Sequence, residues 1–307
     1  IQVCESVSAK YTRADVRSKM PPGFEYILDE LLNVTDDINR EYYYSEIIDS
    51  ILSTGIAEEF IIAVCGLIRS LTIDRLHIIG DIYDRGPRAD LIIEELIRFD
   101  SVDIEWGNHD SLWMGASAGS DVCIATVLNN SMTYKNLDVI EFGYGISLRP
   151  LAIFAEEKYG NSKIDAFLPK GGVGGNRFER GNEETVARMH KAIALIQFKL
   201  ECLTIERNPS FEMEDRKLLA KVNNDGRVDI NGQSYAIKDE DFTVQSYELT
   251  EKEKSLMLYL KEAFQRSEKL QRHIRFLYEK GSMYRISNGN LLFHGCIPLK
   301  NDGEFLK

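Results

Sequence analysis

The sequence contains no long apolar run, no excess of positive charge and no closely spaced cysteine pair. Apolar stretches such as residues 60–64 fall far below the ~18 consecutive residues that a membrane span needs. Lys and Arg number 37 against 49 Asp and Glu, which gives a formal net charge of -12. Broad nucleic-acid binding needs a basic surface that displaces counterions. We therefore expect neither a membrane nor a nucleic-acid partner, and the lack of a visible signal peptide favours a cytoplasmic location.

The cysteines are an odd and scattered set without CxxC spacing, which is typical of neither a disulfide framework nor a zinc site. They are Cys4, Cys65, Cys123, Cys202 and Cys296. We expect buried free thiols in a reducing compartment.

The composition is that of an ordinary globular protein. The chain has 307 residues, of which 44% are hydrophobic and 28% are charged. This length corresponds to about two average domains or to one large α/β domain with insertions. The mixture excludes a disordered, collagen-like or coiled-coil protein. The chain starts at Ile1 on a polar stretch, and we expect it to be part of something longer.

Apolar periodicity predicts helices first and an α/β unit after them. Residues 23–33, 45–52 and 57–71 carry helical patterns. Residues 75–80 and 102–107 read as short buried strands, and residues 89–98 between them read as a helix. A strand, a turn, a helix and a strand form a parallel unit, in which functional residues gather at the carboxyl ends of the strands.

The second half predicts a loop, two helices and short strands. The glycine-rich residues 160–185 read as a mobile surface loop, and a helix follows over residues 184–203. Residues 221–237 read as short strands with tight turns. Thr250 and Glu253 form a capping box that opens one long helix, which closes near Gly281. Short strands over residues 283–287 and 291–293 then lead to His294.

Polar residues cluster at both predicted strand ends. The first end reads GDIYDRG over residues 80–86, and the second reads GNHD over residues 107–110. Glycines there let the backbone turn sharply and let ligands approach closely. Carboxylates, an amide and an imidazole suit a divalent metal, and an arginine suits a phosphate. Either motif alone is compatible with an ordinary turn, but the pair indicates two-metal phosphoester hydrolysis.

The other histidines and the tryptophans have structural interpretations. His77 lies inside a strand and is expected to pack in the core or at a sheet edge. His190 is expected to be structural or on the surface, and His273, in a charged helix, is expected to be solvated. Trp106 and Trp113 flank the GNHD motif and are expected to pack.

A bisphosphate would need a second anion site, for which the sequence offers Arg88, Lys135 and Arg149 near the motifs. Each of them is more often an ordinary surface charge. The glycine-rich residues 170–175 lack the Gly-Lys-Ser/Thr ending of a P-loop and are expected to form a flexible loop.

The motif pair resembles the signature of metallophosphoesterases, a superfamily that includes serine/threonine protein phosphatases. The closer resemblance is to class III fructose-1,6-bisphosphatases, the bacterial type. The similar stretches cover most of the chain from about residue 20 onward, and they are residues 76–92, 102–120, 129–152, 189–201, 268–284 and 291–303.

The resemblance implies roles for six residues. Asp81 would bridge two metal ions, and Asn108 and His294 would bind the second of them. His109 would donate a proton to the leaving-group oxygen and would be oriented by Asp84, since a carboxylate keeps a histidine protonated near neutral pH. Arg85 would hold the phosphate.

Two motifs of that family are absent from this sequence. The family begins its site with an Asp-x-His motif, and no Asp-x-His precedes Asp81. It ends its site with a Gly-His-Thr-type motif, whereas this chain ends at Lys307, 13 residues after His294. We therefore expect an internal fragment of a class III enzyme that holds only part of the binuclear site and is inactive alone.

The fold implied is α/β, a metallo-dependent phosphatase-like two-sheet sandwich flanked by helices, with helical insertions and incomplete at both ends. The expected segments are a helical one over residues 1–72, the core with both motifs over 73–160, a mobile loop with a helical and β-hairpin insertion over 161–282, and a return to the core over 283–307.

The function implied is metal-dependent hydrolysis of the 1-phosphate of fructose 1,6-bisphosphate to fructose 6-phosphate, the gluconeogenic step. Attack would be in line, without a phosphoenzyme, and Mn²⁺ is expected ahead of Mg²⁺. The acidic surface and long helices are compatible with a homo-oligomer. Two alternatives stay open: a protein or dinucleoside polyphosphate phosphatase, and a non-catalytic chain whose fold serves assembly or regulation.

Overall fold

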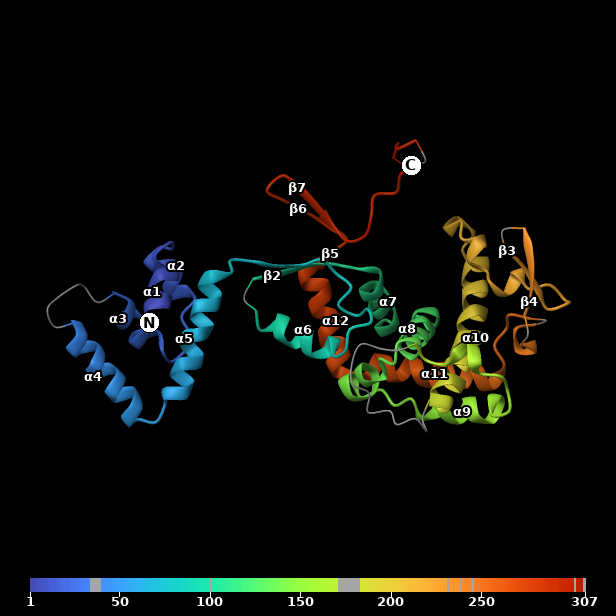
Figure 1. Cartoon of the computed structure of the whole chain (residues 1–307), viewed down its shortest axis with the longest axis horizontal. Coiled ribbons are helices and arrows are strands. Elements are labelled where there is room, and N and C mark those ends of the chain that lie inside the picture. Colours follow the sequence, from blue (N-terminus) through green and yellow to red (C-terminus); the bar gives the residue numbers. More distant parts are fainter. Residues whose placement is uncertain are drawn as a thin grey trace. The chain divides into compact units, whose positions relative to one another are not determined.

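The structure is a computed structural model that describes residues 1–33, 40–99, 101–170, 183–230, 232–237, 239–243, 246–300 and 302–305 (Figure 1). The chain forms two compact units. One consists of Ile1–His77 with Asp100–Asp103, and the other of Ile78–Phe99 with Ile104–Lys307.

The first unit is built from helices around a small apolar core. The helices are α1 (Gln2–Ser8), α2 (Arg13–Ser18), α3 (Glu25–Asn33), α4 (Arg40–Ser53) and α5 (Ala57–Thr72). The core includes Cys4, Leu28, Leu31, Leu67 and Leu71, each almost fully buried. The helices predicted from the periodicity of α3, α4 and α5 are confirmed, and α1 and α2 add a helical start.

The predicted strand, helix and strand are also confirmed. Strand β1 (Leu76–Ile78), helix α6 (Ala89–Ile97) and strand β2 (Val102–Glu105) follow one another. Strand β5 (Gly281–Ser282) completes a three-stranded sheet in the order β1-β2-β5. The β2–β5 pair is parallel, and Ile104 lies opposite Gly281 in its register. The carboxyl ends of β1 and β2 lead directly into the two motifs.

Helix α10 (Glu183–Arg207) is central to the second unit and is buried along most of its length. Helices α8 (Asp121–Thr133) and α9 (Arg149–Tyr159) lie against it, and α7 (Asn108–Ser117) packs on α8 (Figure 1). A short π-helix, η1 (Val139–Gly143), links α8 to α9. Among the described residues, no helix combines the length and apolar character that a membrane crossing requires.

The single long helix expected from Thr250 to Gly281 is instead two helices. They are α11 (Glu251–Arg266) and α12 (Glu268–Lys280), and they meet at Ser267 (Figure 1). Ser267 has an extended backbone, and its Oγ accepts a hydrogen bond from the N–H of Leu270. The same hydroxyl donates to the carbonyl of Tyr144 at 2.7 Å. Serine at an N-cap starts a new helix, so the chain turns between the capping box at Thr250 and the expected end near Gly281.

Short elements complete the second unit. Strands β3 (Arg227–Ile230) and β4 (Gln233–Ala236) form one antiparallel hairpin, and β6 (Tyr284–Ser287) and β7 (Asn290–Phe293) form another. The predicted turn between β6 and β7 is confirmed, with positive φ at Asn288 and Gly289. The single-turn 3₁₀ helices are η2 (Asp165–Phe167), η4 (Pro209–Phe211), η5 (Glu214–Arg216), η6 (Leu219–Lys221) and η7 (Glu240–Phe242). Residues 171–182 of the expected loop lie outside the described part of the chain.

The described fold is therefore mixed α/β and predominantly helical. Its strands form one three-stranded sheet and two two-stranded sheets.

Candidate active site

One buried carboxylate holds the two motif loops together. Asp110, which is fully buried, accepts backbone N–H bonds from Asp81 at 2.7 Å, Gly107 at 2.9 Å and Tyr83 at 3.2 Å. Burial raises the pKa of Asp110, and these three donors oppose that rise by stabilising the charged form. The loop after β1 is thus fastened to the start of α7 through a side chain of the GNHD motif.

Two glycines allow the loops to approach this closely. Gly80 has a φ of +90°, and a Cβ placed on it would lie 2.5 Å from the carbonyl oxygen of Glu105 and 2.8 Å from Nδ1 of His294. A Cβ on Gly107 would collide with the carboxylate of Asp81. Asp81 itself has a φ of +56°, a conformation that non-glycine residues adopt rarely. The contacts of Asp110 with this loop help to hold that backbone.

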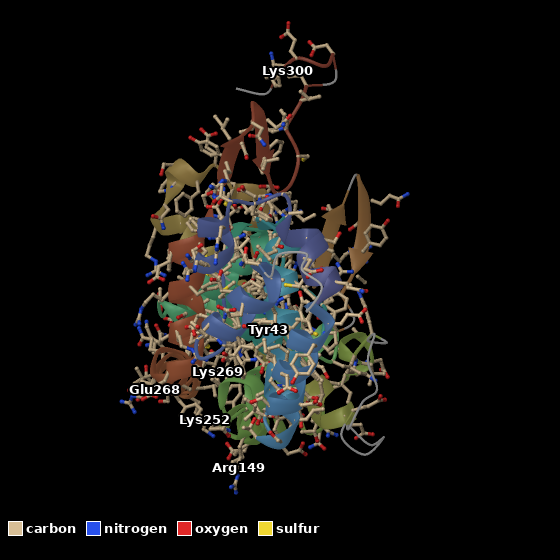
Figure 2. All side chains as sticks on the ribbon, turned by 90° about the vertical axis from the view of Figure 1, so that its left-hand side faces the viewer. Tyr43, Arg149, Lys252, Glu268, Lys269 and Lys300 are labelled. Carbon is tan, nitrogen blue, oxygen red and sulfur yellow. The ribbon has the colours of Figure 1, made fainter. Side chains whose placement is uncertain are left out.

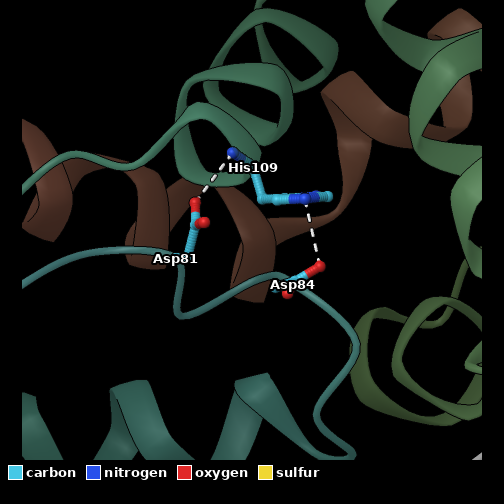
Figure 3. Close-up of side chains that lie close together, drawn as sticks. All are labelled: Asp81, Asp84 and His109. Atoms are coloured by element: carbon cyan, nitrogen blue, oxygen red, sulfur yellow. Dashed lines mark hydrogen bonds and ion pairs between the residues drawn. The ribbon is translucent and has the colours of Figure 1, made fainter. Parts of the chain in front are cut away.

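The side chains of Asp84 and His109 form an ion pair. Nε2 of His109 lies 3.0 Å from Oδ1 of Asp84, and its backbone N–H donates to Oδ1 of Asp81 at 3.1 Å (Figure 3). Nε of Arg85 lies 3.5 Å from the same Oδ1 of Asp84. The three side chains from the GDIYDRG and GNHD loops therefore meet at the carboxyl end of the sheet.

A third segment reaches this place from the far end of the chain. His294 follows strand β7, and its Nε2 lies 3.1 Å from Oδ2 of Asp81. Its Nδ1 lies 2.5 Å from the carbonyl oxygen of Ile79. The bond to that carbonyl and the charge of Asp81 raise the pKa of His294. The imidazole is thus fixed between the end of β1 and the Asp81 carboxylate.

The donor atoms suit a divalent metal ion. Carboxylate, imidazole and amide groups are ligands for Mn²⁺, Mg²⁺, Fe²⁺ and Zn²⁺. One ligand atom each from Asp81, Asp84 and His109 lie within 4.8 Å of one another. The expected ligand Asn108 is the first residue of α7 and has an exposed side chain. One carboxylate oxygen of Asp81 thus lies close to His294, and the other lies close to His109, which pairs with Asp84.

The suggested second-anion residues have other partners or positions. Arg88 pairs with the buried carboxylate of Asp90 at 2.9 Å, and Lys135 pairs with Glu183 at 2.6 Å. Arg149 begins α9 and points away from the ribbon (Figure 2). None of these three cations is among the described residues that line the pocket of Arg85.

The expectation that His273 is solvated is wrong. His273 is fully buried, its Nδ1 lies 3.1 Å from the hydroxyl of Tyr144, and its Nε2 lies 3.0 Å from Glu94. Burial lowers its pKa. The Tyr144 hydroxyl lies 2.6 Å from that of Tyr83, so a buried chain of polar groups leads from α12 to the motif loop. The buried face of α12 carries Leu270, Ile274 and Leu277 at helical spacing with His273, which could have revealed its burial from sequence.

The other structural interpretations hold. His190 is buried and lies 2.9 Å from the carbonyl of Phe167, and His77 pairs with Asp103. Trp113 is buried and stacks on Tyr83, and Nε1 of Trp106 donates to a backbone carbonyl of α12.

The expectation of buried thiols holds only in part. Cys4 and Cys202 are buried, Cys123 is intermediate, and Cys65 and Cys296 are exposed. Cys65 lies outside the buried stripe of α5, which explains its exposure.

Two sets of contacts at this site were not predicted from the sequence. Asp110 makes the first, because it accepts hydrogen bonds from backbone groups up to 29 residues away. The other involves Tyr134, because the guanidinium of Arg85 lies over its ring, 4.4 Å from the centroid. No spacing rule links either residue to its partner.

Comparisons with known proteins agree with this chemistry. The described site has the donor set of a metal-dependent phosphoester hydrolase. A family model described as "Firmicute fructose-1,6-bisphosphatase" matches residues 1–307, and the chain belongs to this family. No solved structure matches the chain.

Curated relatives are similar over nearly all of this chain. "Fructose-1,6-bisphosphatase class 3" of Clostridium novyi is 50% identical over 99% of the chain and 46% of the relative. The protein of the same description from Alkaliphilus metalliredigens is 50% identical over 100% of the chain and 47% of the relative. The protein of the same description from Clostridioides difficile is 47% identical over 100% of the chain and 47% of the relative. The chain spans about half the length of the curated relatives it matches.

Proposed function

We propose that this chain contributes to a fructose-1,6-bisphosphatase, which hydrolyses the 1-phosphate of fructose 1,6-bisphosphate to fructose 6-phosphate in gluconeogenesis. The observation that carries the proposal is the 3.1 Å approach of His294 to Asp81, in a chain of this family. It joins a carboxylate and an imidazole from distant segments beside the Asp84–His109 pair. Such a cluster has little structural purpose at a sheet edge and suits metal-assisted phosphate chemistry.

In this proposal Asp81, Asn108 and His294 would hold the metal ions. The ions, Mn²⁺ ahead of Mg²⁺, would polarise the phosphate and lower the pKa of the attacking water. Asp81 and His294, which lie 3.1 Å apart, offer the carboxylate and imidazole donors that such ions accept. Asp81 is held for this task by the N–H of His109 on one oxygen and by His294 on the other.

The remaining residues act on the substrate. Arg85 grips the phosphate through two N–H groups of its guanidinium. Water attacks phosphorus in line, the bond to the C1 oxygen breaks, and no phosphoenzyme forms. His109 gives its proton to that leaving oxygen, and Asp84, 3.0 Å from Nε2, orients the imidazole.

The surrounding architecture is also a proposal. We propose that the small sheets join a two-sheet metallophosphoesterase sandwich in the whole protein, with the segment boundaries expected above. We further propose a cytoplasmic protein that acts on a small sugar bisphosphate and forms a homo-oligomer.

A substrate comparison tests the assignment. The full-length gene product is assayed with Mn²⁺ for phosphate release from fructose 1,6-bisphosphate, a phosphopeptide and a dinucleoside polyphosphate. Preference for the sugar bisphosphate supports the proposal. Preference for either other substrate replaces the assignment with that phosphatase, and release from none of the three favours a non-catalytic role in assembly.

A further inference from the structure

The side chain of Arg85 rests on an aromatic ring. Its guanidinium carbon lies 4.4 Å from the centroid of the Tyr134 ring. The arginine side chain is 62% exposed, and its contact with Asp84 is a loose 3.5 Å. Burial therefore does not fix the position of the guanidinium. Of its two contacts, with Asp84 and with the Tyr134 ring, the ring is the main support. An arginine favours this stacked arrangement because its planar cation is attracted to the ring face.

Tyr134 follows directly on a well-packed helix. It caps the carboxyl end of α8, and its N–H donates to the carbonyl of Asn130 at 3.1 Å. Helix α8 is anchored by Ile124, Leu128 and Met132, all fully buried. The ring is therefore attached to one of the best-packed helices of the unit, whereas Arg85 lies in a loop.

The same turn holds the loop at a second point. Nδ2 of Asn136 donates to the carbonyl oxygen of Gly86 at 3.1 Å. The N–H of Asn136 donates to Ser131 at 2.7 Å, which fastens the turn back onto α8. Lys135 between them has a positive φ and directs its ammonium to Glu183. The turn thus supports the arginine loop with one ring and one amide.

These residues share a pocket with the proposed proton donor. Arg85, Tyr134 and Asn136 line the same small pocket as Asp84 and His109. The neutral ring supports the arginine without adding negative charge to that of Asp84, which lies 3.5 Å from Nε. A stacked guanidinium also keeps its N–H edge free for two parallel bonds to phosphate oxygens. Holding a flexible side chain in its bound geometry lowers the entropy lost on binding.

We propose that Tyr134 and Asn136 are positioning residues that hold Arg85 ready for a phosphate group. The inference rests on the proposed function only in taking Arg85 as a phosphate ligand. It assigns a task to the C-terminal turn of α8, which neither motif contains. Tyr134 acts through its ring face, so its hydroxyl is dispensable.

The test measures binding of inorganic phosphate to the Mn²⁺-loaded full-length protein by calorimetry. Tyr134→Leu is expected to raise the dissociation constant about 2- to 5-fold, the range of an exposed cation–π contact. Tyr134→Phe, which keeps the ring, is expected to match wild type. Asn136→Ala is expected to weaken binding in the same direction as Tyr134→Leu. Thermal unfolding of each variant verifies that the fold is retained.

A double-mutant cycle separates positioning from general packing. In an Arg85→Ala background, Tyr134→Leu is expected to have no further effect on phosphate binding. An equal effect of Tyr134→Leu with and without Arg85 would overturn the inference, as would wild-type affinity in Tyr134→Leu. Phosphate binding without turnover of fructose 1,6-bisphosphate would contradict the substrate assignment alone. No phosphate binding by the wild type would contradict both.

Discussion

The imidazole of His294 lies 3.1 Å from the carboxylate of Asp81, although 213 residues separate them in the sequence. Strands β6 and β7 precede this histidine and place it beside the loop that follows β1. A carboxylate that also accepts the N–H of His109 becomes the centre of the site. Asp81 therefore connects the His294 segment with the GNHD loop.

Loss of His294 should weaken metal binding specifically. In the full-length protein we expect His294→Ala to raise the Mn²⁺ concentration for half-maximal activity by roughly 10-fold or more, because even indirect partners of metal ligands matter that much. Cys296→Ser, at an exposed position two residues on, is the matched control and should behave as wild type. An unchanged Mn²⁺ requirement in His294→Ala would remove this histidine from the ligand set.

Asp84 and His109 should act as one unit. We expect His109→Gln to lower kcat on the order of 100-fold, the usual contribution of general acid catalysis, with Mn²⁺ affinity retained. Asp84→Asn should lower kcat in the same direction, because the imidazole loses the partner at 3.0 Å. The double variant should be no slower than His109→Gln alone. Additive losses of kcat in the double variant would show that the two residues work independently.

Asp110 should matter for stability as well as activity. Asparagine at this position presents an amide where three backbone N–H groups need an acceptor. We expect Asp110→Asn to reduce the free energy of unfolding by about 1–3 kcal/mol, the range for leaving buried groups unpaired. Asp215→Asn, at an exposed position, should change it by less than about 0.5 kcal/mol. Urea unfolding of both variants checks this, and equal effects would contradict the role given to Asp110.

Glu253 should make the fold sensitive to acid. This buried carboxylate pairs with Lys158 at 2.8 Å and Lys199 at 2.9 Å. Burial raises its pKa, but the bonds from Lys158, the N–H of Thr250 and Lys199 outweigh burial and lower the pKa from 4.5 to about 2. A carboxyl with a lowered folded-state pKa contributes stability that is present above pH 4.5 and is lost as the pH falls toward 2.

The test of Glu253 compares stability across that interval. We expect Glu253→Gln to be less stable than wild type near neutral pH and to lose less stability between pH 4.5 and pH 3. Glu251→Gln, on an exposed carboxylate of the same helix, should keep the wild-type slope. A wild-type slope in Glu253→Gln would mean that the acid sensitivity arises elsewhere.

Local patterns were sufficient to predict much of the fold. The apolar stripes of α3, α5 and α6 have helical spacing, and β1 and β2 are short runs that end in glycine-containing motifs. The break at Ser267 was missed because the capping box at Thr250 and the glycine at position 281 mark only the outer ends of the two helices. The cap that starts α12 is a single hydroxyl, whose bond to Tyr144 exists only in the folded chain.

The clustering of the motif residues was predictable from the sequence, but the contacts among them and their neighbours were not. The motifs place Asp81, Asp84, Arg85 and His109 at strand ends, where the geometry of a parallel sheet gathers side chains. The roles of Asp110 and Tyr134 arise from contacts across 29 and 49 residues. Such contacts depend on how helices pack, which a single sequence does not encode in any local spacing.

The most direct test is phosphate release from fructose 1,6-bisphosphate with Mn²⁺ by the full-length protein, measured beside an Asp81→Asn variant. We expect the wild type to form fructose 6-phosphate and phosphate in equal amounts. We also expect a chelator to stop the reaction, Mn²⁺ to restore it, and Asp81→Asn to have almost no activity. Undiminished release by Asp81→Asn, or no release by the metal-loaded wild type, would contradict the proposed site.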